Sequence, residues 1–250
     1  MPPGPPTAPP AILIRNARLR FGDRLLFDGL GATIEAGRTT CLLGPSGVGK
    51  STLLRLAAGL AAPEPPTRVE ASDGQPLQGR TAWMGQQDLL MPWLSVLDNV
   101  LVGSRLRGER PDRDRAMNLL AEVGLADRAL DRPAALSGGM RQRAALARTL
   151  MEDRPVVLMD EPFSSLDALT RLTLQDMAGR LLAGRTVLLV THDPLEALRL
   201  ADRVLILEGS PAELSEFPAP AAATPRRVAD PALLAAQGAL LARLGVGAAP

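Results

Sequence analysis

Three short, continuous apolar runs in this chain each end in polar or glycine-rich residues. The runs cover residues 39–43, 155–159 and 186–190. An uninterrupted apolar stretch of this length is typical of a strand buried on both faces of a parallel sheet. The carboxyl ends of parallel strands meet at one edge of the sheet, and in open α/β folds ligands bind there. The pattern therefore predicts an α/β fold with a functional site at that edge.

Weaker patterns predict further strands around this core. Apolar residues alternate or cluster over 12–19 and 31–34 around turn-like breaks, which favours short antiparallel strands ahead of the run at 39–43. Other strand-like runs lie at 68–71, 81–84 and 202–207.

Helical spacing of apolar residues predicts the remaining elements. A helical pattern covers 51–60, and amphipathic helices of a surface subdomain are expected within 105–131. An Ala- and Leu-rich helix is expected at 232–244, as an appendage that packs on the domain or stabilises a dimer.

A polar break at 85–88 joins the strand-like run at 81–84 to an apolar stretch at 89–100. Such a junction is a candidate hinge and a candidate protein contact. A simple loop that leads into a core helix is the alternative.

Composition and charge limit the class of protein. With 250 residues, 46% of them hydrophobic, the chain can bury a sizeable core. Its net charge of +1 gives no strong electrostatic footprint for nucleic acid, so no nucleic-acid partner is expected. The single cysteine, Cys41, cannot form an internal disulfide and is expected to be a buried small hydrophobic residue.

The first residues, 1–11, are rich in proline and have neither the basic region nor the apolar core of a secretory signal. We expect an extended, disordered tail there. The chain also lacks a window of about 18 consecutive apolar residues that would span a membrane. If the protein serves a membrane process, another chain must supply the membrane part.

The stretch GPSGVGKST at 44–52 fits the phosphate-loop pattern G-x-x-x-x-G-K-[ST] between a predicted strand and a predicted helix. Its glycines leave the backbone free to curve, so that successive N–H groups can converge on phosphate oxygens at the positive end of the helix. The alternative is a glycine-rich turn with a chance lysine. The candidate nucleotide-binding residues here are Gly44, Pro45, Ser46, Gly47, Val48, Gly49, Lys50, Ser51 and Thr52.

Lys50 is the only lysine among 28 basic residues. A chain that otherwise uses arginine places a compact ammonium only where a planar guanidinium would not fit the loop. We therefore expect Lys50 to reach the β- and γ-phosphates of a nucleotide, and the Ser51 hydroxyl to bind Mg²⁺.

The sequence LSGGMRQR at 136–143 opens another predicted helix. Ser137, Gly138 and Gly139 precede it, so the helix N-terminus offers a hydroxyl and free N–H groups to an anion. An ordinary helix cap needs Ser137 but not both glycines.

Carboxylates and the only histidine follow the other buried runs. Asp160 and Glu161 end the first, and His192 follows the second, at the same predicted sheet edge as the phosphate loop. A lone histidine is usually structural, but this position favours a functional role. Phe21 lies beside a turn in a chain with 2% aromatic residues, where stacking on a flat ligand such as adenine and a place in the core are equally open.

The order of these segments resembles the ATP-binding subunit of an ABC transporter over residues 12–207. The matching motifs are Walker A at 44–51, a Q-loop at Gln86, the signature LSGGM, Walker B ending in Asp160 with Glu161 next to it, a D-loop at 164–167, and the switch His192. The resemblance implies a P-loop NTPase fold with a RecA-like, mostly parallel core, an antiparallel β subdomain and an α-helical subdomain at about 89–150.

The resemblance also implies the cofactors ATP and Mg²⁺ and a head-to-tail homodimer. Each ATP would lie between Walker A of one subunit and Ser137, Gly138 and Gly139 of the other. This arrangement fits the residues, since a second anion-binding helix end has no use inside a site already built around Lys50.

Roles for single residues follow from the resemblance. Asp160 would hold Mg²⁺ through water, together with Ser51 and Gln86, while Glu161 orients or deprotonates the attacking water. Adjacent strand residues point to opposite sides, so the two carboxylates can take different tasks. Gln86 and His192 would sense the γ-phosphate, which with Glu161 and Lys50 gives the catalytic set, and Phe21 occupies the position where the family stacks an aromatic ring on adenine.

The segment 90–96 is most similar to importers of nitrate, sulfonate, taurine and thiamine-precursor pyrimidines, and especially to the hydroxymethylpyrimidine type. Gly85 stands where the family often has Phe, which should loosen the hinge. The implied partners are integral-membrane permease subunits and, indirectly, a solute-binding protein, with the subunit peripheral on the cytoplasmic face of the cell membrane.

Other classes fit the sequence less well. A soluble ABC protein not coupled to transport would carry two cassettes or a long coiled-coil insertion, and a small-molecule kinase would lack LSGGM and the D-loop. We expect one nucleotide-binding domain at 12–210 and a C-terminal extension at 211–250.

Overall fold

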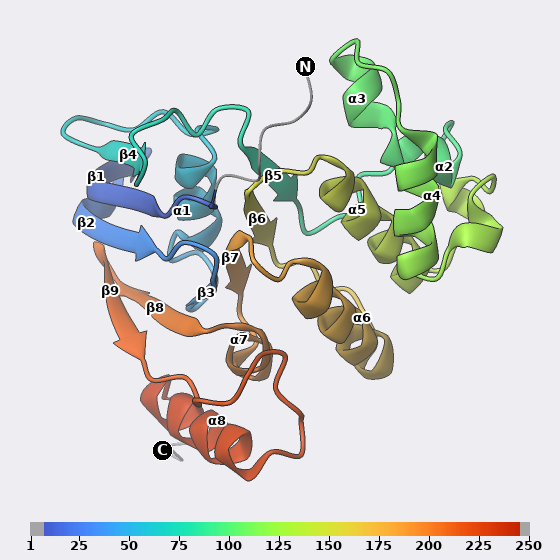
Figure 1. The fold of residues 1–250 in the computed structure, drawn as a ribbon. Coiled ribbons are helices and arrows are strands. Elements are labelled where there is room, and N and C mark those ends of the chain that lie inside the picture. The colour runs from blue at the N-terminus through green and yellow to red at the C-terminus, as the bar shows by residue number, and fades with distance from the viewer. Residues whose placement is uncertain (1–7, 246–250) are drawn as a thin grey trace.

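The computed structural model of the chain describes residues 8–245, apart from the side chain of Phe21 (Figure 1). Within this part, the strands form a six-stranded sheet of order β5-β6-β7-β3-β8-β9 and a three-stranded sheet of order β2-β1-β4. The strands are β1 (Ile12–Phe21), β2 (Arg24–Ile34), β3 (Thr39–Leu43), β4 (Arg68–Ala71), β5 (Thr81–Met84), β6 (Val156–Asp160), β7 (Thr186–Thr191), β8 (Arg203–Gly209) and β9 (Ala212–Phe217).

The larger sheet is parallel from β5 through β6, β7 and β3 to β8. Leu43 at the end of β3 pairs with Thr191 at the end of β7, and Asp160 at the end of β6 pairs with Val190. This register brings the carboxyl ends of three strands to one edge. The predicted parallel core is confirmed, and the residues expected at its functional edge lie together there.

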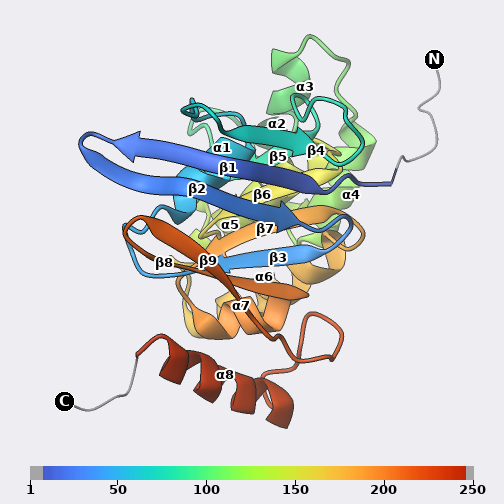
Figure 2. The same cartoon turned by 90° about the vertical axis from the view of Figure 1, so that its left-hand side faces the viewer.

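The three-stranded sheet is antiparallel and covers one side of helix α1 (Lys50–Ala57), as Figures 1 and 2 show. Its inner side chains share a core with α1 and the parallel strands, represented by Ile14, Phe27, Leu53 and Leu188. Helix α1, which follows the phosphate loop, is therefore packed between the antiparallel sheet and the parallel sheet.

The chain between β5 and β6 forms a helical part at one side of the parallel sheet (Figure 1). It occupies most of the stretch expected as a helical subdomain, and a second apolar core joins it to the sheet. Its helices are α2 (Val96–Val100), α3 (Val102–Leu106), α4 (Arg113–Glu122) and α5 (Gly138–Met151), with 3₁₀ turns at Ala126–Arg128 and Pro133–Ala135. The later helices are α6 (Ala168–Leu181), α7 (Pro194–Leu200) and α8 (Pro231–Arg243).

Two expected boundaries differ from the structure. Residues 8–11 lie in the expected tail but attach to the core, because Thr186 Oγ1 donates to the Pro10 carbonyl at 2.8 Å and the Ala11 amide donates to Ser72 Oγ at 3.0 Å. The rest of that tail, 1–7, lies outside the described residues. The sheet also continues past residue 210, since β9 pairs with β8 within the expected extension. We missed β9 because it is a short edge strand in which only Ala212 is buried, so that its hydrophobic pattern is weak.

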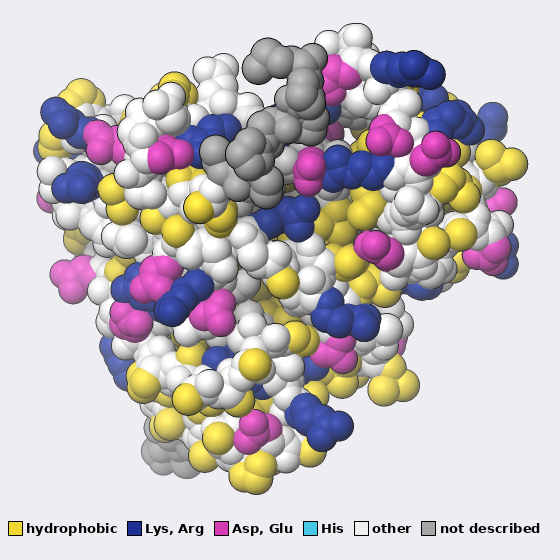
Figure 3. All heavy atoms as spheres, viewed as in Figure 1, with side chains coloured by type: hydrophobic (Ala, Val, Ile, Leu, Met, Phe, Trp, Pro, Cys, Tyr) yellow, Lys and Arg dark blue, Asp and Glu magenta, His cyan; other side chains and the backbone are white. Residues whose placement is uncertain are grey.

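None of the helices within 8–245 is long and apolar enough to cross a membrane. On the face shown in Figure 3, basic and acidic side chains are interspersed and do not form one large patch of either sign.

The C-terminal segment is fastened to α7 by Arg226. This side chain is buried, and its guanidinium donates to the carbonyls of Leu198 at 2.6 Å and Ala201 at 2.7 Å, and also to that of Pro220. The last carbonyls of a helix have no partners within the helix, so Arg226 satisfies the C-terminal end of α7. The extension is therefore part of the domain's packing.

Replacing Arg226 by leucine should lower the free energy of unfolding by about 2–4 kcal/mol, because hydrogen bonds to charged groups contribute about 1.5–3 kcal/mol each and buried carbonyls would lose their donor. Urea denaturation measures the change. The neighbouring Arg227→Leu, at an exposed position, is the matched control and should shift stability by less than about 0.5 kcal/mol. Equal effects of the two changes would contradict this role for Arg226.

Candidate functional site

Two glycines of the loop at 44–49 are required by close packing. A Cβ atom at Gly44 would lie 2.2 Å from the carbonyl oxygen of Leu207 in β8. Gly49 has φ +113°, and a Cβ there would lie 2.8 Å from the ring of Phe27. A side chain at either position would displace backbone or a buried ring, so packing on β8 and β2 fixes where this loop lies.

Lys50 begins α1 and is buried under the loop. Its ammonium donates to the carbonyl oxygens of Gly44 at 2.8 Å and Pro45 at 2.9 Å. Burial lowers the pKa of Lys50, while the nearby carboxylates of Glu161 and Asp160 oppose that shift. The loop thus holds a positive charge at its centre, as predicted.

The next residue contacts the first Walker B carboxylate. Ser51 Oγ donates to Asp160 Oδ1 at 2.8 Å, so the hydroxyl and the carboxylate face each other across the ends of α1 and β6. No group of three or more His, Cys, Asp or Glu residues in the described part of the chain could form an all-protein metal site. Mg²⁺ bound with a nucleotide takes one or two protein ligands and fills its shell with phosphate oxygens and water. Ser51 and Asp160 fit that need.

Glu161 and His192 meet at the sheet edge. Glu161 Oε2 lies 3.0 Å from His192 Nδ1, and the histidine side chain is 55% exposed against 19% for the glutamate. Both residues directly follow the ends of neighbouring parallel strands. The structure places His192 at the expected edge of the sheet, next to Glu161, while its role as a γ-phosphate sensor stays a prediction.

Asp160 and Glu161 do not point in different directions because of alternation along a strand, as the sequence suggested. Glu161 is not a strand residue: β6 ends at Asp160, and Glu161 has φ +46°. Its amide donates to the Val190 carbonyl at 2.9 Å, which anchors the turn on β7. A left-handed turn, not the alternation along a strand, directs the two carboxylates differently. A non-glycine residue in this conformation is uncommon and is found preferentially at functional sites.

A pocket of about 430 Å³ lies against the phosphate loop. Two of its lining residues, Arg24 and Leu26 on β2, were missed by the sequence analysis, although they follow the Phe21 turn closely. The side chain of Phe21 itself is outside the described part, so its stacking on adenine stays a prediction. The other lining residues are Ser46, Gly47, Gly49, Lys50, Ser51, Thr52 and Glu161.

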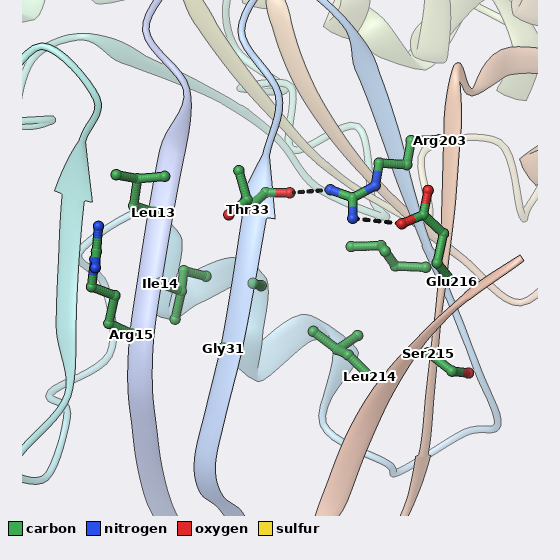
Figure 4. Close-up of a pocket in the computed structure, with 11 residues that line it drawn as sticks. Leu13, Ile14, Arg15, Gly31, Thr33, Arg203, Leu214, Ser215 and Glu216 are labelled. Carbon is green, nitrogen blue, oxygen red and sulfur yellow. Dashed lines mark hydrogen bonds and ion pairs between the residues drawn. The ribbon is translucent and has the colours of Figure 1, made fainter.

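A second hollow, of about 550 Å³, lies between β1, β2, β8 and β9 (Figure 4). It shares no lining residue with the pocket at the phosphate loop. Arg203 crosses it and donates to the Thr33 carbonyl at 2.9 Å and to Glu216 at 2.6 Å. This hollow is therefore separate from the pocket at the phosphate loop.

The signature residues lie outside the phosphate-loop pocket of the same chain. Ser137 caps α5 by accepting from the Met140 amide at 3.3 Å, and neither it nor Gly138 or Gly139 lines that pocket. The structure also gives Gly139 a packing reason, because a Cβ atom there would lie 2.4 Å from Thr170 Cγ2 at the start of α6.

Gln86 is not brought to the phosphate loop by its side chain. It is exposed and does not line the pocket, whereas its backbone carbonyl accepts from Gln142 Nε2 at 3.0 Å. Val48, another residue of the predicted set, is buried in the core below the loop. The roles of Gln86 as a metal ligand and γ-phosphate sensor stay predictions.

Comparison with known proteins finds relatives that match nearly the full length of the chain. A profile of the ABC transporter family matches residues 27–164. The chain is 47% identical over 245 residues to an aliphatic sulfonates import ATP-binding protein of Nocardia farcinica, a match that covers 96% of this chain and 95% of that protein. It is 41% identical to a protein of the same name from Mesorhizobium japonicum, covering 94% of this chain and 88% of that one.

A solved structure of an ABC transporter of metal-chelate type, in an inward-facing conformation, has the same fold. It superposes with a TM-score of 0.70 at 28% sequence identity, and the match covers 83% of each chain. The resemblance to the hydroxymethylpyrimidine type gains no support from the relatives named here, which carry the name of aliphatic sulfonates.

Proposed function

Because the chain belongs to the ABC transporter family and is a transport-coupled ATPase subunit of the importer type, we propose that it hydrolyses Mg-ATP in a head-to-tail homodimer. Each ATP would bind the phosphate loop of one copy and the Ser137 end of α5 in the other. Hydrolysis would drive uptake through a separate membrane permease.

The contact between Glu161 and His192 is the observation that carries the hydrolytic mechanism. The carboxylate lines the pocket that holds Lys50 and Ser51, and the imidazole is 3.0 Å from it. A glutamate in this place can take a proton from a water aimed at the γ-phosphate, and His192 can hold that glutamate in position. When bound, Mg²⁺ would neutralise phosphate charge between Ser51 and Asp160.

Lys50 supplies the second part of the site. Its ammonium now bonds to two loop carbonyls, and phosphate oxygens would be stronger partners for the same charge. The backbone amides of 46–49 and the start of α1 add further donors for the phosphates.

The placement of α5 supports the proposal of a second copy. Its N-terminus is capped by Ser137 and carries two glycines, yet none of the three lines the pocket of its own chain. A helix N-terminus attracts anions. A head-to-tail dimer would give this end of α5 the phosphates of the partner's nucleotide.

The permease contact is proposed at the surface formed by Leu89 and Trp93, which are 61% and 67% exposed. The sequence left open a core position for this stretch. Leu90, Val96 and Leu97 are indeed buried, but Trp93 is not. Exposed aromatic side chains of this kind commonly dominate a protein contact. Docking there would place the subunit on the cytoplasmic face of the membrane, beneath a permease that receives solute from a binding protein.

We further propose aliphatic sulfonates as the transported solutes, on the basis of the names of the relatives. Deletion of the gene in its host should abolish growth on an alkanesulfonate as the sole sulfur source and leave growth on sulfate intact. Undiminished growth on the sulfonate would reject this substrate without affecting the ATPase proposal.

Glu161→Gln should retain ATP affinity within a few-fold and lose hydrolysis by about 10²–10⁴-fold, because the amide keeps the shape of the carboxylate but cannot accept the proton. Nucleotide titration and phosphate release measure the two effects. The exposed Glu213→Gln on β9 is the control and should behave as the parent. If Glu161→Gln lost ATP binding as well, the carboxylate would be a structural or metal-binding group.

Two inactive variants should restore activity when mixed. Ser137→Arg removes the anion-binding end of α5, and Lys50→Ala removes the ammonium from the phosphate loop. Each homodimer should therefore be inactive. A mixed dimer pairs an intact Lys50 with an intact Ser137 at one of its two interfaces, and part of the hydrolysis should return. Confirmed mixed dimers without any activity would refute the shared site.

Trp93→Ala should weaken assembly with the permease by about 2 kcal/mol or more, since it removes a large exposed anchor. ATP binding and thermal stability of the isolated subunit should stay near those of the parent, because the side chain is largely in solvent. Co-purification of the permease measures assembly, and Leu60→Ala, at a position that is 67% exposed after α1, is the control. A large loss of stability with assembly preserved would contradict the proposed contact.

A further inference from the structure

The segment 86–89, which leads from β5 to the proposed permease contact, is held along α5 by side-chain hydrogen bonds. Gln142 Nε2 donates to the Gln86 carbonyl at 3.0 Å, and Arg141 Nε donates to Asp88 Oδ2 at 3.0 Å. Arg148 makes the most contacts, because its guanidinium donates to the carbonyl of Leu89 at 2.8 Å and to that of Asp88 at 2.5 Å.

These contacts are partly shielded from solvent. Gln142 is 3% exposed, and burial lowers the pKa of Arg148. A charged donor that binds two adjacent carbonyls makes stronger hydrogen bonds than a neutral one and fixes direction as well as distance. The attachment of 86–89 to α5 therefore joins a largely exposed segment to a half-buried arginine and a buried glutamine.

Leu89 has an unusual backbone conformation at this attachment. Its φ is +47°, in the left-handed region that leucine rarely adopts, and its side chain is 61% exposed. Such a conformation persists only where the surroundings enforce it. Arg148 binds the carbonyls of Asp88 and Leu89, which flank the Cα atom of Leu89, so it holds the turn that directs Leu89 outward.

The second half of the contact surface is fixed by α2. Asn99 is fully buried, and it accepts from the Met91 amide at 2.7 Å and donates to the carbonyls of Met91 and Ser95 at 3.1 and 3.0 Å. Trp93 lies within that closed loop. Leu89 and Trp93 are thus presented by two helices of the same helical part.

We propose that Arg148, with Gln142, is a positioning residue that couples the permease contact to the ATP site. Its hydrogen bonds make segment 86–89 move together with α5. A displacement of Leu89 and Trp93 by the permease would then move the Ser137 end of α5. This rests on the proposed permease contact and shared ATP site. The polar break at 85–88 is then not flexible along its whole length, as a hinge would be.

Arg143 supplies a matched control on the same helix. Its guanidinium also donates to two adjacent carbonyls, those of Val123 at 3.0 Å and Gly124 at 3.4 Å, but these belong to the turn after α4. Removing either arginine takes two similar hydrogen bonds from α5. Only Arg148 should affect the permease-facing segment.

The first experiment is amide hydrogen exchange on the isolated subunit, with Arg148→Gln, the milder Arg148→Lys, and Arg143→Gln. Arg148→Gln should speed exchange at 87–91 by at least tenfold, and Arg148→Lys by less. Arg143→Gln should leave 87–91 unchanged and speed exchange near 123–126 instead. Unchanged exchange at 87–91 in both Arg148 variants, or equal acceleration there in Arg143→Gln, would overturn the proposal. If Arg148→Gln does not fold, the lysine variant decides.

The second experiment is ATP hydrolysis by the whole transporter reconstituted in vesicles. Arg148→Gln should keep the ATP affinity of the parent within twofold and lose most of the stimulation of hydrolysis by transported solute, whereas Arg143→Gln should keep both. Retained stimulation in Arg148→Gln would overturn the coupling role. If the permease does not stimulate ATP hydrolysis even by the parent subunit, the proposed function fails. The hydrogen-exchange result would still show whether Arg148 holds segment 86–89 on α5.

Discussion

The shared register of β6, β7 and β3 is the constraint on which the nucleotide site depends. Because Leu43 pairs with Thr191 and Asp160 with Val190, the residues that follow these strands meet at the same edge. The phosphate loop, the Walker B carboxylates and His192 come from distant parts of the sequence, and pairing by backbone hydrogen bonds aligns them. A slip of one residue in any of these pairs would turn its side chains to the other face.

Packing against this frame then determines the details of the phosphate loop. The carbonyl of Leu207 leaves no space for a side chain at Gly44, and the ring of Phe27 leaves none at Gly49. One side of the loop therefore packs on β8 and β2, and its other side lines the pocket. In that pocket one buried ammonium, Lys50, lies near the carboxylates of Glu161 and Asp160.

Helix α5 connects the two proposed ends of the coupling path. Its first turn carries Ser137 and the two glycines, and its later turns hold the segment that leads to Leu89 and Trp93. A helix of this length is stiff, so a movement of α5 shifts both the residues bound along its side and those at its N-terminal end. The hydrogen bonds from Gln142 and Arg148 restrain the backbone of this exposed segment.

The sequence by itself determined the parallel core, the order of the motifs and the choice of the candidate site residues Lys50, Ser51, Asp160, Glu161 and His192. These follow from local patterns: continuous apolar runs, glycine spacing and the polar residues that end each run. The sequence did not show β9, because an edge strand buries few side chains and leaves a weak pattern. It also suggested that Asp160 and Glu161 differ by alternation along a strand, whereas a left-handed turn at Glu161 separates them. Only the tertiary structure decided the partners of Arg148 and Arg226, and the place of Arg24 and Leu26 in the pocket. An arginine in a helical pattern looks like any solvated residue until the carbonyls that it satisfies, tens of residues away, are brought beside it by the fold.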